Sequence, residues 1–313
     1  MEILEELPAM PEVRTRKKIR PEAVLGLIAA AEVVLLLLML LLSLPYMLAE
    51  EDPEPLIHQN HQNEAYAPET EATEPEETEP EETTVPTIPP EENPYGRLDF
   101  QYNRNNYLLC QRQDSFPGVD VSAFQGKIDW QKVADSGIQF AIVRLGYRGY
   151  GKAGKMVEDE YARQNLEGAR EAGLAVGAYF FSQALSIDEV DEEIEFLLNI
   201  LGDFQLDMPL ILDWEQVGVE GARTANMDAR TLTNMQVHFC QTMSAKGYQP
   251  MVYFNWYQSS KLLYLSELEA YPFWLALYQD RMTYPYRVEM WQYTDQGKVP
   301  GIQGNVDINV YMP

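Results

Sequence analysis

The sequence predicts an α/β protein whose main domain, residues 117–313, is an irregular barrel of the TIM type. Short apolar runs rich in β-branched residues alternate with amphipathic segments as far as residue 263, as in successive β/α units. After that point the helical segments disappear and three further apolar runs follow. Five β/α units and three strands with few helices are sufficient to close an eight-stranded barrel.

Each expected strand is a short apolar run bounded by glycine, proline or a polar residue. The first five strands belong to the β/α units, and the last three are joined by loops. A glycine- and tyrosine-bearing loop is expected at 146–154, and its glycines do not follow the order of a nucleotide-binding loop. The strands are expected at 118–122, 140–145, 175–181, 209–213, 250–255, 273–277, 288–293 and 306–310.

The expected helices are marked by their caps. Asp129 is expected to cap the first helix, and Ser186 with Glu189 forms the sequence of a capping box for the third. Glycines follow the ends of several of these segments, as is typical of helix C-termini. The remaining helices are expected at 158–172, 231–246 and 257–263.

The N-terminal part of the chain predicts a membrane anchor. Residues 1–22 form a basic, cytoplasmic segment, and residues 23–47 are almost wholly apolar. A run of this length fits a transmembrane helix, and the preceding lysines and arginines favour a cytoplasmic N-terminus. The main domain is then expected outside the cell, attached to the membrane by a single pass. A cleavable signal peptide is the alternative, although residues 47–49 match a cleavage site poorly.

Residues 48–94 have the composition of an extended stalk. Between residues 50 and 94 there are fifteen acidic and no basic residues, with many prolines, so this stretch cannot form a packed core. It carries much of the formal net charge of −26, which argues against nucleic acid as a partner. Residues 95–116 form a short segment before the domain, and 99–102 with 107–109 indicate a hairpin.

Histidine and cysteine are too scarce for several common kinds of site. The main domain has one histidine, His238, which we interpret as structural, and no set of zinc ligands. Cys110 and Cys240 could form a disulfide or remain free. An oxygen-ligated metal held by acidic residues is conceivable, but the same acids fit another chemistry better. No cofactor and no metal are therefore expected.

Two acidic residues end the fourth strand. Asp213 and Glu215 are separated by one residue, so in a strand both side chains point to the same face while Trp214 points to the other. Repulsion and partial burial would separate their pKa values, leaving one protonated and the other charged. The alternative is a pair of solvated loop acids. A protonated acid beside an anion is what glycosidic bond cleavage requires.

Other polar and aromatic residues fall at the same end of the predicted barrel. Asp120 lies toward the end of the first strand and Asp307 lies in the last. The carboxyl ends of barrel strands meet at one face, where barrel enzymes build their active sites. Aromatic and amide side chains are typical of sugar-binding sites. The candidate substrate-binding residues are Tyr147, Tyr179, Tyr253, Asn255, Trp274, Gln292 and Asn309.

The order of short motifs resembles family 25 of the glycoside hydrolases, the Chalaropsis-type lysozymes. The opening motif is Gly-Val-Asp-Val-Ser at 118–122, followed by Gln-Gly-Lys-Ile-Asp-Trp at 125–130. The resemblance continues through 140–147, 177–180 and 212–215 and ends at 291–293 and 304–309, so it covers the whole main domain. Phe124 stands where members of the family often carry histidine or tyrosine.

The resemblance implies hydrolysis of the β-1,4 bond between N-acetylmuramic acid and N-acetylglucosamine in peptidoglycan. It implies that Glu215 is the general acid and that Asp213 orients the substrate's acetamido group, which itself attacks the sugar. Asp120 and Asp307 would line the floor of the site. The alternatives are a tethered peptidoglycan-binding module without turnover and a different β-1,4-N-acetylglycosaminidase.

Overall fold

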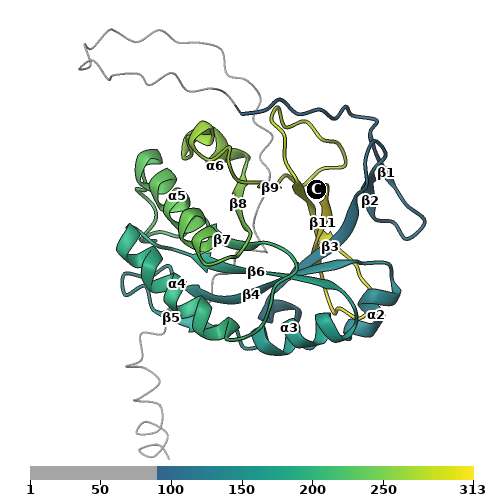
Figure 1. Cartoon of the computed structure of the whole chain (residues 1–313), viewed down its shortest axis with the longest axis horizontal. Coiled ribbons are helices and arrows are strands. Elements are labelled where there is room, and N and C mark those ends of the chain that lie inside the picture. The colour runs from purple at the N-terminus through teal and green to yellow at the C-terminus, as the bar shows by residue number, and fades with distance from the viewer. Residues whose placement is uncertain (1–89) are drawn as a thin grey trace, which may run out of the picture. The chain divides into compact units, whose positions relative to one another are not determined.

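The computed structural model describes residues 90–313, and eight of its strands form a closed barrel (Figure 1). The order around the barrel is β3-β11-β10-β9-β8-β7-β6-β4, and β3 pairs with β4 to close it. Only β11 runs antiparallel to its neighbours. The strands are β3 (Phe116–Val121), β4 (Phe140–Arg148), β6 (Ala175–Ser182), β7 (Leu210–Trp214), β8 (Pro250–Asn255), β9 (Phe273–Ala276), β10 (Met290–Gly297) and β11 (Val306–Tyr311).

Helices follow the first five barrel strands, as the sequence predicts. Asp129 caps the first helix by accepting a hydrogen bond from the Lys132 amide. Ser186 caps the third, but the Glu189 carboxylate bonds the Leu185 amide instead of completing a capping box. The helices are α2 (Trp130–Asp135), α3 (Ala162–Glu171), α4 (Ile187–Leu201), α5 (Ala229–Ala245) and α6 (Trp256–Lys261), with short 3-10 turns η2 (Ala123–Gln125) and η3 (Leu265–Glu267).

The loop expected at 146–154 and the helix expected from 158 are both corrected by the structure. Strand β4 continues to Arg148 and turns back into β5 (Met156–Glu158), with Gly146 opposite Glu158. A side chain at Gly146 would lie 2.5 Å from the Val157 carbonyl oxygen, so only glycine permits this close pairing. Helix α3 begins four residues later than expected, after Asp159 has accepted a bond from the Tyr161 amide.

The expected hairpin before the barrel is present and packs against it. Strands β1 (Phe100–Tyr102) and β2 (Leu108–Cys110) pair antiparallel. The Phe100 ring meets Trp291 of β10 edge-on at 5.1 Å, and the Leu108 amide donates to the Tyr293 hydroxyl at 3.2 Å. The hairpin therefore covers the outer face of β10, where no helix follows the strand.

The barrel interior is filled with apolar side chains at one end. Phe140, Ile142, Ile211 and Met251 are buried there. A Cβ atom at Gly118 would lie 2.3 Å from the Phe140 ring, so the missing side chain makes room for that ring. The amino ends of the parallel strands are therefore filled by the core.

The predicted anchor and nearly all of the stalk lie outside the described residues. Within residues 90–313, no helix is long and apolar enough to span a bilayer. Cys110 and Cys240 are both buried and both free. His238 lies on α5, where its Nε2 atom is 2.6 Å from the Asp191 carboxylate of α4, in agreement with a structural role.

Candidate active site

Asp213 and Glu215 both project into the barrel where β7 ends. Asp213 lies two residues after Ile211, which points to the barrel interior, so Asp213 points to the interior as well. Trp214 lies on the outer face, where its indole donates to the Ala184 carbonyl. Asp213 is 7% exposed and Glu215 is 3% exposed. The Tyr253 hydroxyl donates to Glu215 Oε1 at 2.9 Å. The alternative of two solvated loop acids is therefore wrong.

Asp120 and Asp307 face each other on neighbouring strands. They are direct partners in the antiparallel pairing of β3 with β11, and each is 3% exposed. Asp120 Oδ2 accepts two hydrogen bonds, from the Asn309 amide at 2.7 Å and from the Gln292 amide at 2.9 Å. These amides offset the cost of burying a carboxylate there and fix its direction.

The same amides connect Asp120 to two aromatic residues. Asn309 Oδ1 accepts from the Trp274 indole at 2.8 Å, and Gln292 Oε1 accepts from the Tyr278 hydroxyl at 3.1 Å. Trp274 also meets the Tyr253 ring edge-on at 4.8 Å. The network therefore runs around the rim from β9 through β10 and β11 to β3.

The four carboxyl groups influence one another electrostatically. Burial, and then the charges of Glu215 and Asp120, raise the pKa of Asp213 well above its ordinary value, with a smaller contribution from Asp307. The Arg144 guanidinium acts in the opposite direction on the pKa of Asp213. Burial and the Asp307, Glu215 and Asp120 charges likewise raise the pKa of the Tyr278 hydroxyl. Two buried carboxyls that interact in this way ionise in separate steps, so the Asp213–Glu215 pair can hold one proton.

The remaining candidate substrate-binding residues differ in their surroundings. Tyr179 and Tyr147 are buried in the interior cluster, which limits the ring surface that a ligand can reach. Asn255 caps α6, with its Oδ1 atom accepting from the Gln258 amide at 2.9 Å. Its carboxamide oxygen is therefore already used by the fold.

Sequence reasoning missed a buried ion pair beside the acids. Arg144 of β4 and Asp159 are 2.8 Å apart, and both side chains are almost completely buried. The sequence does indicate a buried charge here, since Arg144 interrupts an otherwise apolar strand. It lies two residues after Ile142 and so shares the interior face. Tyr278, an aromatic residue of the kind expected in a sugar site, donates its hydroxyl to Gln292.

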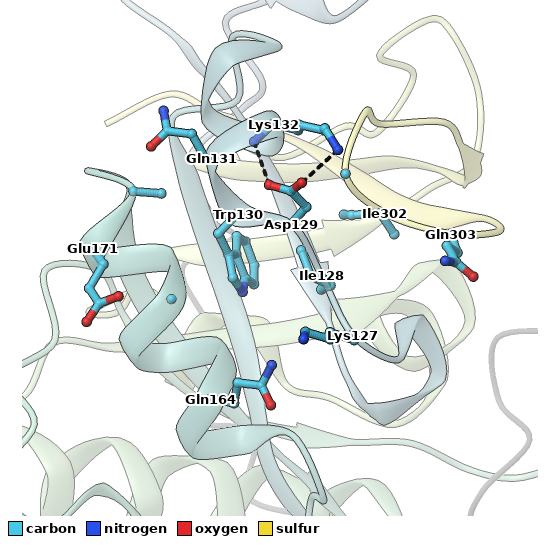
Figure 2. A pocket seen from close by; sticks show the side chains of 13 residues that line it. Lys127, Ile128, Asp129, Trp130, Gln131, Lys132, Gln164, Glu171, Ile302 and Gln303 are labelled. Atoms are coloured by element: carbon cyan, nitrogen blue, oxygen red, sulfur yellow. Dashed lines mark hydrogen bonds and ion pairs between the residues drawn. The ribbon is translucent and has the colours of Figure 1, made fainter.

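A cavity of about 850 Å³ lies away from these acids, among α2, α3 and the β10–β11 loop. Figure 2 shows its lining, in which Asp129 is bonded to Lys132 beside Trp130. None of the four interior acids lines it. Among the described residues, no three histidine, cysteine or acidic side chains are arranged to hold a metal ion.

Comparison with known proteins identifies the family. The model of glycosyl hydrolases family 25 matches residues 119–302, which is more than half of the chain. The chain belongs to this family. It is therefore a glycosidase of the lysozyme-like class.

Three relatives illustrate the similarity of this family 25 member to other proteins. YegX of Escherichia coli K12 is 32% identical over 208 residues, covering 62% of this chain and 68% of YegX. Lysozyme M1 of Streptomyces globisporus is 24% identical over 204 residues, covering 62% of this chain and 67% of Lysozyme M1. The autolysin LytC of Streptococcus pneumoniae, solved with a synthetic peptidoglycan ligand, has a TM-score of 0.56 and 25% identity, covering 69% of this chain. The similarity spans about half of LytC, 52% of that chain.

Proposed function

We propose that this family 25 protein cleaves the β-1,4 bond between N-acetylmuramic acid and N-acetylglucosamine in peptidoglycan. The observation that carries the proposal is the meeting of Asp120, Asp213, Glu215 and Asp307 inside the barrel where the parallel strands finish, from β3, β11 and the end of β7. Relatives named autolytic lysozyme and Lysozyme M1, and an autolysin solved with a peptidoglycan ligand, support this class of substrate.

In the proposed reaction, Glu215 is the general acid. It donates its proton to the glycosidic oxygen as the bond from the anomeric carbon to that oxygen breaks. The oxygen of the substrate's own acetamido group forms a new bond to the anomeric carbon. Water then attacks this carbon, and the bond between the carbon and the acetamido oxygen breaks. The Glu215 carboxylate takes a proton from the attacking water. The enzyme therefore ends in its starting state.

Asp213 acts on the acetamido group. As a carboxylate it accepts the acetamido N–H, orients the oxygen for attack and stabilises the positive charge that develops on the group. The strand spacing supports this arrangement, because both carboxyls point to the interior face of the barrel from positions two residues apart. Asp120 and Asp307 line the floor, and the amides of Asn309 and Gln292 keep Asp120 in place.

We also propose that residues 23–47 anchor the protein in the cell membrane, with the N-terminus in the cytoplasm and the enzyme domain outside. The acidic stalk at 48–94 then allows the domain to reach the wall. Sedimentation of the full-length protein with membranes is the expected result. A mature form in the medium that begins near residue 50 would instead indicate a cleaved signal peptide.

The test of the reaction uses the full-length protein and defined peptidoglycan. We expect wild type to lower the turbidity of cell walls and to release fragments whose masses correspond to N-acetylmuramic acid reducing ends. Glu215→Gln should abolish release, because an amide of the same shape cannot donate the proton. Full activity of Glu215→Gln would show that its assigned role is wrong, and fragments with N-acetylglucosamine reducing ends would indicate a different glycosaminidase. Binding of muropeptides without any product would instead indicate a binding module.

A further inference from the structure

Glu215 lies just beyond the part of β7 that the sheet holds. The pairing of β7 with β8 ends at Leu212, and its pairing with β6 ends at Trp214. Asp213 therefore lies within the sheet, opposite Phe181 of β6, whereas Glu215 follows the last residue of the strand. Strand pairing thus fixes the backbone of Asp213, but the backbone at Glu215 depends on other contacts.

Two buried glutamine side chains hold the carbonyl oxygens on either side of the Glu215 α-carbon. Gln183, which follows β6, donates from Nε2 to the Glu215 carbonyl at 2.5 Å. Gln258 of α6 donates from Nε2 to the Trp214 carbonyl at 2.5 Å. The two glutamines are 0% and 2% exposed. A buried carbonyl needs a donor, and here side chains supply it where strand pairing has ended.

The direction of each glutamine carboxamide follows from its other partners. Gln183 Nε2 also donates to the Ser182 carbonyl at 3.1 Å, while its Oε1 atom accepts from the Thr224 hydroxyl at 3.1 Å. Gln258 Oε1 accepts from the Asn255 amide at 2.8 Å. Because carbonyl oxygens only accept and backbone N–H groups only donate hydrogen bonds, the Nε2 atom of each glutamine must face the end of β7.

Holding both carbonyls fixes the backbone angles of Glu215. Each carbonyl belongs to one of the two planar peptide groups that flank its α-carbon, and the soft angles between these planes are φ and ψ alone. The direction of the Cα–Cβ bond is then fixed as well. The Tyr253 hydroxyl, at 2.9 Å from Oε1, holds the other end of the side chain. The side chain of Glu215 is therefore held both at the backbone and at the carboxyl group.

We propose that Gln183 and Gln258 are positioning residues that direct the Glu215 carboxyl group at the glycosidic oxygen. The proposal rests on the proposed function, in which Glu215 is the general acid. Proton transfer requires hydrogen-bond reach, and a displacement of about 1 Å at a reacting group can lower the rate about 100-fold. The backbone of Asp213 is held by β6 instead, so recognition of the acetamido group should survive the loss of either glutamine.

The primary test compares Gln183→Met with Gln236→Met in the full-length protein. Gln236 of α5 is the matched control, since it is 1% exposed and its Nε2 atom donates to another β7 carbonyl, that of Leu212, at 3.2 Å. Leu212 is paired with both neighbouring strands, so its backbone does not depend on that bond.

We expect kcat on soluble peptidoglycan fragments to fall about 10- to 100-fold in Gln183→Met, with KM close to that of wild type. Gln236→Met should keep the wild-type kcat, although both variants lose a buried hydrogen bond. Urea unfolding verifies that each variant is folded. Wild-type kcat in folded Gln183→Met would overturn the proposal, and so would an equal fall of kcat in the two variants.

A second substrate separates proton donation from a general loss of activity. The 2,4-dinitrophenyl glycoside of the N-acetylglucosamine–N-acetylmuramic acid disaccharide releases a phenolate that needs no proton, so its cleavage depends little on a general acid. The loss of kcat/KM in Gln183→Met should therefore be much smaller on this glycoside than on peptidoglycan. Gln258→Met removes the donor on the other side of Glu215 and should show the same difference, so it provides the test if Gln183→Met does not fold. Equal losses on both substrates would refute the role in proton donation.

Hydrogen exchange distinguishes a failure of this proposal from a failure of the proposed reaction. Wild type that cleaves neither substrate would contradict the reaction, and the role of Gln183 is then measured on the backbone itself. Amide exchange of residues 213–218 is followed by mass spectrometry in wild type, Gln183→Met and Gln236→Met. Faster exchange of this segment in Gln183→Met alone supports the role of Gln183 in fixing the end of β7. Equal exchange in the three folded proteins would contradict it.

Discussion

Replacing Phe100 with alanine should destabilise the barrel, although Phe100 lies before the region matched by the family. The side chain is 6% exposed, and its ring packs edge-on against Trp291 at 5.1 Å and Tyr95 at 5.5 Å. Truncating a buried phenylalanine loses its transfer free energy and leaves a cavity. We expect the free energy of unfolding to fall by about 3–5 kcal/mol.

The assay is urea unfolding of the full-length protein, followed by tryptophan fluorescence, which Trp291 beside Phe100 makes sensitive to this region. Tyr102→Ala is the control, because Tyr102 lies on the same strand but is 49% exposed. We expect that variant to lose only about 1 kcal/mol. Folded Phe100→Ala should keep wild-type kcat, since the hairpin covers the outside of β10. Equal losses in the two variants would refute the conclusion that the hairpin is part of the barrel's packing.

Two further predictions concern stability. Burial raises the pKa of Glu193 to about 7 despite the opposing Arg148 charge, so the folded protein binds this proton more tightly than the unfolded chain does. The contribution of this proton to the free energy of unfolding is complete below pH 4.5. It is lost as the pH rises through 7, by about 3 kcal/mol in all. The free energy of unfolding measured against pH should show this decrease in wild type but not in Glu193→Gln. Gly118→Ala should cost about 1–3 kcal/mol or more, because the new Cβ atom would overlap the Phe140 ring, which lies 2.3 Å away. Chemical unfolding of Gly118→Ala with and without Phe140→Leu checks this, and failure of the smaller side chain to restore stability would contradict the overlap.

The barrel strands were predictable because each carries its own local signal. Apolar runs of five or six residues, separated by helices with recognisable caps such as Asp129, predict the strand order directly. The hairpin of β4 with β5 was not predictable, since its only sequence feature was a glycine-rich stretch. Gly146 reads as a loop residue in the sequence, whereas its role is to let the Val157 backbone approach closely.

Parts of the candidate site were predictable for the same reason. The two-residue spacing of Asp213 and Glu215 determines their common face whatever surrounds them. The partners of Asp120 were a different matter, because Gln292 and Asn309 lie 172 and 189 residues away in the chain. Tyr278 shows the same limit, since nothing near it in the sequence indicates a bond to Gln292.

The sequence by itself determined the strand order, the shared face of the acid pair and the family, because these depend on local periodicity and on the order of short motifs. Only the tertiary structure decided that β3 and β11 bring Asp120 opposite Asp307, that the hairpin covers β10, and that Arg144 and Asp159 are buried together beside the acids. Barrel closure creates these contacts between residues far apart in the chain. Burial then sets how strongly their charges act, and it depends on which strands meet when the barrel closes.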